Sequence, residues 1–159
     1  MATWQFLVVL IPASWAEENS YSSSALYDEE GYDTECAWNG RQPESDFKDT
    51  LGEVLPPSKS WHEELLTWGN EKEHDIQVWY ENETIDGIHI RLDLNQNLNE
   101  IIIKVVKAAH ALNCALFFPE LKLVAEANVF EMKNAIKNSN AAKFVSNPQE
   151  FINELSKKT

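Results

Sequence analysis

The fold of this chain is decided by one stretch, DIQVWYENETIDGIHIRLDL, which spans residues 75–94. Apolar and polar residues alternate along 75–80 and again along 87–94. Alternation with a period of two is typical of half-buried β-strands. The residues between the two runs, 81–86, are polar, and Gly87 is available for the turn. The stretch therefore predicts an antiparallel hairpin.

The same alternation assigns each hairpin residue to one of two faces. We expect the core face to carry Ile76, Val78, Tyr80, Ile88, Ile90, Leu92 and Leu94. The outward face then carries Asp75, Gln77, Trp79, His89, Arg91 and Asp93. Because it combines an aromatic ring with an imidazole and a guanidinium, the outward face is a candidate binding surface.

Apolar runs on both sides of the hairpin predict further strands. Residues 4–11 form a continuous run closed by Pro12, and residues 114–118 form another that stops at Pro119. Such unbroken runs suit strands that are buried on both faces. A strand is also favoured over 64–69.

Helical spacing of apolar residues predicts helices over 44–55, 98–112 and 128–138, and a last one from 147 onward. The order of elements predicts a single α+β domain over residues 1–159. We expect a mainly antiparallel sheet with a βαββαβ-like core, helices on one face and a C-terminal helical extension. A chain of 159 residues can bury about 70% of its unfolded surface, which is enough for a sizeable core.

Residues 13–43 form a long polar stretch without clear periodicity, rich in serine, tyrosine and acidic residues. A stretch of this length is usually a functional loop or an insert. Its tyrosines argue against full disorder, so we expect an ordered surface loop.

The charge of the chain is distributed unevenly. Residues 1–100 carry 21 Asp and Glu against 5 Lys and Arg, whereas the remaining residues carry 5 against 8. Such a field favours a cationic partner and repels phosphates, so nucleic acid is not expected as a direct partner. The same charge can imitate nucleic acid and occupy a basic cleft on another protein.

The cysteines and the N-terminus indicate a reduced, cytoplasmic protein. Cys36 and Cys114 are far apart in the sequence and suggest neither a disulfide framework nor a zinc site. The negative surroundings of Cys36 should raise the pKa of its thiol and oppose thiolate chemistry. The apolar run that starts at Phe6 is too short to span a membrane, and no basic residue precedes it.

No motif indicates catalysis, a metal or a cofactor. The histidines at 62, 74, 89 and 110 match no ligand spacing, and a histidine beside an acid is expected by chance in a chain with 26 acids. The acidic loop 28–33 lacks the ligand spacing of a calcium loop. The chain also has neither a nucleophile motif nor a glycine-rich phosphate loop. The interpretation is a protein without enzymatic activity, cofactor or metal.

We expect a protein-binding domain that uses an acidic, aromatic-rich surface against a basic partner. Its most concrete form is an immunity or inhibitor protein that neutralises a cationic toxin or nuclease. The candidate contact residues are Tyr27, Asp28, Glu29, Glu30, Tyr32, Asp33, Trp38, Trp79, His89 and Arg91. One alternative is a small-molecule-binding or enzymatic domain with a pocket between the sheet and residues 13–43. In the other alternative the acidity serves solubility alone.

Overall fold

The computed structural model describes residues 1–145 and 147–156. The main sheet contains β1 (Gln5–Pro12), β4 (Pro57–Ser58), β5 (Leu65–Gly69), β6 (Asp75–Glu81), β7 (Thr84–Asp93), β8 (Cys114–Phe118) and β9 (Leu123–Ala125). Its strand order is β4-β5-β6-β7-β1-β8-β9, and every neighbouring pair is antiparallel. A separate small hairpin pairs β2 (Tyr27–Asp28) with β3 (Gly31–Tyr32).

The helices are α1 (Ala13–Glu18), α2 (Glu35–Trp38), α3 (Phe47–Gly52), α4 (Asn99–Ala111), α5 (Val129–Lys137) and α6 (Pro148–Ser156), with short 3-10 turns η1 (Ser24–Leu26), η2 (Pro119–Leu121) and η3 (Ala141–Phe144). In chain order, β1, α3, β6, β7, α4 and β8 form the βαββαβ core, followed by the C-terminal helices. The predicted α+β class is confirmed. Among the described residues, no helix is both long and apolar enough to cross a membrane.

The hairpin of residues 75–94 is the centre of the sheet, and its register agrees with the predicted faces. Asp75 pairs with Arg91 and Gln77 pairs with His89, so these side chains share the outward face. The turn is tighter than the sequence suggested, since the strands continue to Glu81 and resume at Thr84. Positive φ angles at both turn residues, 82 and 83, match the two-residue hairpin turns that suit the twist of a sheet.

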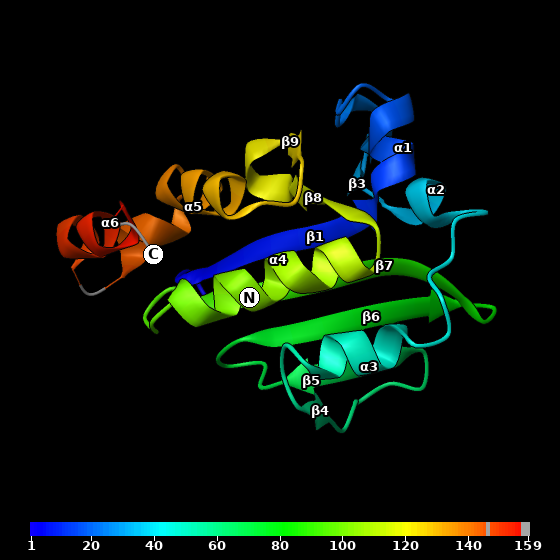
Figure 1. The fold of residues 1–159 in the computed structure, drawn as a ribbon, viewed down its shortest axis with the longest axis horizontal. Helices are drawn as coiled ribbons and strands as arrows, with labels where there is room; N and C mark the ends of the chain where they lie inside the picture. Colours follow the sequence, from blue (N-terminus) through cyan, green and yellow to red (C-terminus); the bar gives the residue numbers. More distant parts are fainter. Residues whose placement is uncertain (146, 157–159) are drawn as a thin grey trace.

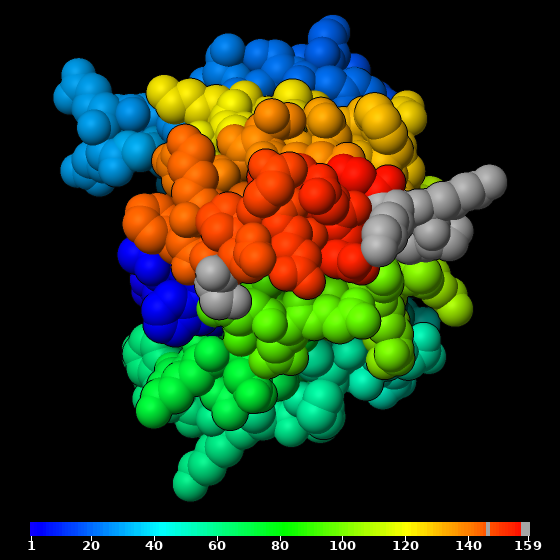
Figure 2. All heavy atoms as spheres, turned by 90° about the vertical axis from the view of Figure 1, so that its left-hand side faces the viewer, coloured from blue at the N-terminus to red at the C-terminus, as the bar shows by residue number. Residues whose placement is uncertain are grey.

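One face of the sheet carries the main core. Figure 1 shows α4 and α3 lying in front of the strands on this side. The buried residues of α4 are Ile101, Ile102, Val105, Ala108 and Ala109. They pack with the core face of the hairpin and with α5 and α6. Figure 2, which shows the end of the molecule drawn on the left in Figure 1, has the orange and red C-terminal residues above the green middle part of the chain.

The opposite face of the sheet is covered only in part, by residues 13–43. Val9, Ile11 and Phe117 of the sheet pack there against Trp15 and Leu26 of this segment. The segment is ordered, as expected, but it contains α1, η1, the small hairpin and α2. Helices are therefore not confined to one face. Helices of four to six residues are too short to produce a clear periodic pattern.

Candidate functional site

Residues 13–43 are attached to the start of β7 by three hydrogen bonds. The Thr34 hydroxyl donates to the carbonyl of Asp86 at 2.7 Å. The Gln42 side chain both accepts from the amide of Ile85 at 2.6 Å and donates to its carbonyl at 3.1 Å. Gly87 permits this close approach, because a Cβ there would lie 2.9 Å from Thr34 Oγ1.

This attachment brings together carboxylates that are far apart in the sequence. Ligand oxygens of Glu35, Glu81 and Asp86 lie within 4.8 Å of one another. Asp33 is near enough to act on the charge of Asp86, and it lines a cleft of about 300 Å³ together with Asp28 and Glu35. We call Asp28, Asp33, Glu35, Glu81 and Asp86 the acidic surface.

The acidic surface is not neutralised within the part of the chain that the structure describes. Its carboxylates form none of the ion pairs found there, which join Arg41 to Glu18, Arg91 to Asp75 and Lys104 to Glu100. Burial, followed by the charges of Glu35, Glu81 and Asp33, raises the pKa of Asp86 to about 6. The surface therefore concentrates negative charge that faces solvent.

Three acidic carboxylates this close could hold a cation between them. Exposed acidic groups also gather without an ion, and no other observation points to a metal at Glu35, Glu81 and Asp86. The arrangement suits a cationic side chain equally well, because a guanidinium offers five donors in a fixed plane.

Aromatic side chains lie beside the acidic surface. The Tyr32 ring lies 5.4 Å from that of Phe117 and 6.2 Å from that of His89. Trp79 is opposite Gly87 in the sheet, and Trp61 meets it edge to face at 5.6 Å between ring centroids. Trp61 is 65% exposed, so it presents a large apolar ring to solvent.

The structure places the predicted contact residues in different environments. Asp28, Glu29, Glu30 and Asp33 are exposed on and next to the small hairpin, as steering charges must be. The half-buried Tyr27 donates its hydroxyl to the carbonyl of Pro119 at 3.1 Å. Tyr32 and Trp79 are half-buried at the border of the acidic surface.

Three further predicted contact residues, Trp38, Arg91 and His89, also have partners within the chain. Trp38 is only 1% exposed and donates its indole N–H to the carbonyl of Leu10 at 3.2 Å, so its assignment as a contact residue is corrected to core packing. Arg91 forms an ion pair with Asp75 within the sheet. His89 lies beneath Tyr32, and burial lowers its pKa to about 4. These two line the sheet face without offering a free charge.

Sequence reasoning missed four residues of this region: Trp61, Glu35, Glu81 and Asp86. The three acids looked like ordinary surface charges because they come from segments about fifty positions apart. The sequence pattern assigns Glu81 to the turn, although it lies two positions after Trp79 and so continues the outward alternation of β6. No local signal in the sequence pointed to Glu35. It lies near Asp86 because the adjacent Thr34 donates a hydrogen bond to the carbonyl of Asp86.

The remaining histidines have structural contacts. His74 Nδ1 accepts from the amide of Asp93 at 2.8 Å, and His62 Nδ1 accepts from the amide of Glu64 at 3.0 Å. His110 Nε2 lies 2.7 Å from the carbonyl of Ala127.

The cysteines are both free thiols, Cys36 exposed and Cys114 buried. Burial and then Asp33 raise the pKa of Cys36. The pKa of Cys36 is raised, as expected, although burial rather than the neighbouring negative charge is the main cause.

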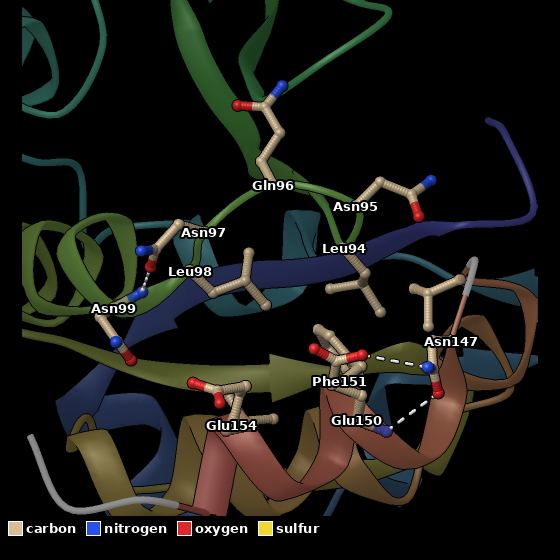
Figure 3. Close-up of a pocket in the computed structure, with 12 residues that line it drawn as sticks. Leu94, Asn95, Gln96, Asn97, Leu98, Asn99, Asn147, Glu150, Phe151 and Glu154 are labelled. Atoms are coloured by element: carbon tan, nitrogen blue, oxygen red, sulfur yellow. Dashed lines mark hydrogen bonds between the residues drawn. The ribbon is translucent and has the colours of Figure 1, made fainter.

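A cleft of about 370 Å³ lies between the loop that leads into α4 and helix α6. Figure 3 shows Leu94, Leu98 and Phe151 around its apolar centre. Two of its side-chain amides make local contacts at helix starts: Asn97 Oδ1 accepts from the backbone N–H of Asn99 at the beginning of α4, and Asn147 Oδ1 accepts from that of Glu150 in the first turn of α6. These contacts stabilise two helix starts, so the polar rim of this cleft has a structural role.

The space between the sheet and residues 13–43 is packed with side chains. The cleft of about 300 Å³ opens at the outer edge of this segment, among residues 25–39, and not within the interface.

Comparison of this chain with protein-family models, with curated proteins and with solved structures found no match.

Proposed function

We propose that this chain is a non-enzymatic protein-binding domain whose acidic surface engages a basic partner. In its most concrete form, it is an immunity or inhibitor protein that neutralises a cationic toxin or nuclease. The observation that carries the proposal is the convergence of carboxylates from residues 28–35, from the end of β6 and from the start of β7, none of which forms an ion pair with a described residue. Their mutual repulsion costs stability, and a cationic partner relieves that repulsion.

The arrangement supports both steps of a fast and lasting association. Exposed carboxylates at the small hairpin and around Asp86 attract a basic surface and raise the association rate. Tyr32 and Trp79 border these charges and provide rigid aromatic area that loses water on contact. The mildly basic last third of the chain supplies mainly helices on the far side of the sheet.

The proposal is tested by affinity capture with a charge-reversed variant. The immobilised chain is exposed at low salt to lysate of the source organism, next to the triple variant Asp33→Lys, Glu35→Lys, Asp86→Lys. Captured proteins are identified by mass spectrometry and titrated as purified proteins. We expect a basic protein that binds the wild type, with an affinity that falls as salt rises, and that binds the variant at least about tenfold more weakly.

A matched control changes the net charge equally at another place. The triple variant Glu17→Lys, Glu53→Lys, Glu63→Lys alters three exposed acids outside the acidic surface. It should keep most of the affinity. The proposal fails if the wild type captures no basic protein, or if both triple variants bind alike.

A further inference from the structure

A second cleft lies on the open part of the sheet, over β4, β5 and β6. It has a volume of about 320 Å³, which is within the range of about 300–1,000 Å³ found for small-molecule sites. Trp61 forms one wall, and Thr67 and Gln77 lie on neighbouring strands of its floor. The segment 13–43 does not reach this part of the face, since its core packs on β1 and β8.

The floor of this cleft is a row of polar side chains in register. Ser58 pairs with Thr67, and Thr67 pairs with Gln77. The Ser58 hydroxyl donates to Thr67 Oγ1 at 2.9 Å, and the Thr67 hydroxyl donates to the Ser58 carbonyl at 3.1 Å. The Gln77 amide forms no hydrogen bond with any described residue. It therefore offers two donors and one acceptor from a half-buried position.

The charges that line the cleft cancel. Lys59 and Glu71 carry opposite charges at its rim, and the carboxylate of Asp75 is paired with Arg91. A site without net charge gives an ionic ligand no Coulomb advantage that would offset the loss of its hydration. The charge balance favours a neutral ligand that both donates and accepts hydrogen bonds.

The wall of the cleft is a supported aromatic ring. Trp61 meets the Trp79 ring edge to face, with an angle of 71° between the planes, and the His62 ring lies 6.0 Å from each tryptophan. These contacts hold the Trp61 side chain, although it is largely exposed. A ring held in this way can bind an apolar surface at little cost in rotamer entropy.

We infer that this cleft binds a neutral sugar residue of an oligosaccharide. A sugar ring has a face of C–H groups that packs on an aromatic ring, and its hydroxyls both donate and accept. Trp61 matches the first property, and the Gln77 amide with the rim of Asn70 and Glu71 matches the second. The inference is independent of the protein partner proposed above, because it uses no residue of the acidic surface.

The experiment titrates the ¹⁵N-labelled full chain with maltohexaose, cellohexaose and N-acetylchitohexaose in turn, and follows amide shifts by NMR. At least one sugar should give saturable shifts that are confined to residues 58–77 and to the Trp61 indole. Trp61→Ala should weaken that binding about tenfold or more. Gln77→Ala should weaken it as well, while Trp4→Ala, a change in a partly exposed tryptophan outside the cleft, should leave it unchanged.

Two outcomes overturn the inference. One is the absence of saturable shifts in residues 58–77 with all three sugars at about 10 mM, a concentration that detects even weak binding. The other is a Trp61→Ala variant that binds as the wild type does. Failure here leaves the capture experiment unaffected, since the two use different residues and different ligands.

Discussion

Asp75 and Arg91 face each other across β6 and β7, and the guanidinium of Arg91 binds both oxygens of the Asp75 carboxylate. The Nε–Oδ1 distance is 2.7 Å. The side chains are only 3% and 17% exposed, respectively. The hydrogen bond to Asp75 is also the main reason that the pKa of Arg91 is raised. The most conspicuous cation of the outward hairpin face is thus part of the fold.

Removing one member of this pair should destabilise the protein strongly. Asp75→Ala leaves a poorly solvated guanidinium without a partner, and we expect the free energy of unfolding in urea to fall by about 3–5 kcal/mol. The double variant Asp75→Leu, Arg91→Met removes both charges, so its free energy of unfolding should fall clearly less than that of Asp75→Ala. Equal losses in the single and double variants would contradict this account of the pair.

Trp38 should contribute to stability rather than to binding. Trp38→Phe deletes the hydrogen bond to Leu10 and part of a filled core site. We expect a loss of about 1–3 kcal/mol in urea denaturation. The exposed Trp61 offers the matched control, because Trp61→Phe should change stability by less than about 0.5 kcal/mol. A Trp38→Phe variant that is as stable as the wild type would contradict the burial of Trp38 in the core.

Gly87→Ala should loosen the contact between residues 13–43 and β7. The new methyl group would lie 2.9 Å from Thr34 Oγ1, so Thr34 or its backbone must move. We expect a loss of about 1–3 kcal/mol and faster hydrogen exchange in residues 33–38. Gly52→Ala is the control, because nothing lies within 4 Å of its added Cβ and its φ is not positive. If exchange in 33–38 stays at the wild-type rate, Gly87 is not what permits the contact.

His89 should make the protein sensitive to mild acid. Burial lowers its pKa in the folded protein from 6.5 to about 4. Between these values the unfolded chain binds a proton that the folded protein refuses, so the free energy of unfolding falls as pH drops through this window. His89→Gln should reduce that slope in urea titrations at several pH values. His62→Gln, a change in an exposed histidine, should keep it.

Asp86 should have the opposite pH dependence. Its pKa is raised from 3.8 to about 6 in the folded protein, so its favourable contribution is complete below about pH 4 and is lost as pH rises through 6. Asp86→Asn removes a negative charge that is disfavoured first by burial and then by repulsion from Glu35 and Glu81. We expect it to stabilise the chain at pH 7 by about 1 kcal/mol after solvent screening. A stability difference that does not shrink toward pH 4 would exclude the charge of Asp86 as its cause.

The elements with strong periodicity could be predicted from the sequence. The hairpin faces followed from alternation alone, because a strand presents its side chains to opposite sides whatever surrounds it. The helix at Asn99–Ala111 could be predicted because its apolar residues recur at helical spacing over several turns. The strands β4 and β9 were missed because two or three residues carry no period. The helical turns within residues 13–43 were missed for the same reason.

The sequence by itself determined the fold class, the buried face of the hairpin and the excess of negative charge, since all three depend on residue order and composition. Only the tertiary structure decided that Glu35 meets Glu81 and Asp86, that Trp38 is buried, and that Arg91 is paired. These are contacts between distant segments. They depend on a glycine that permits close approach and on the strand register that sets Asp75 against Arg91. Neither leaves a periodic signal in the chain.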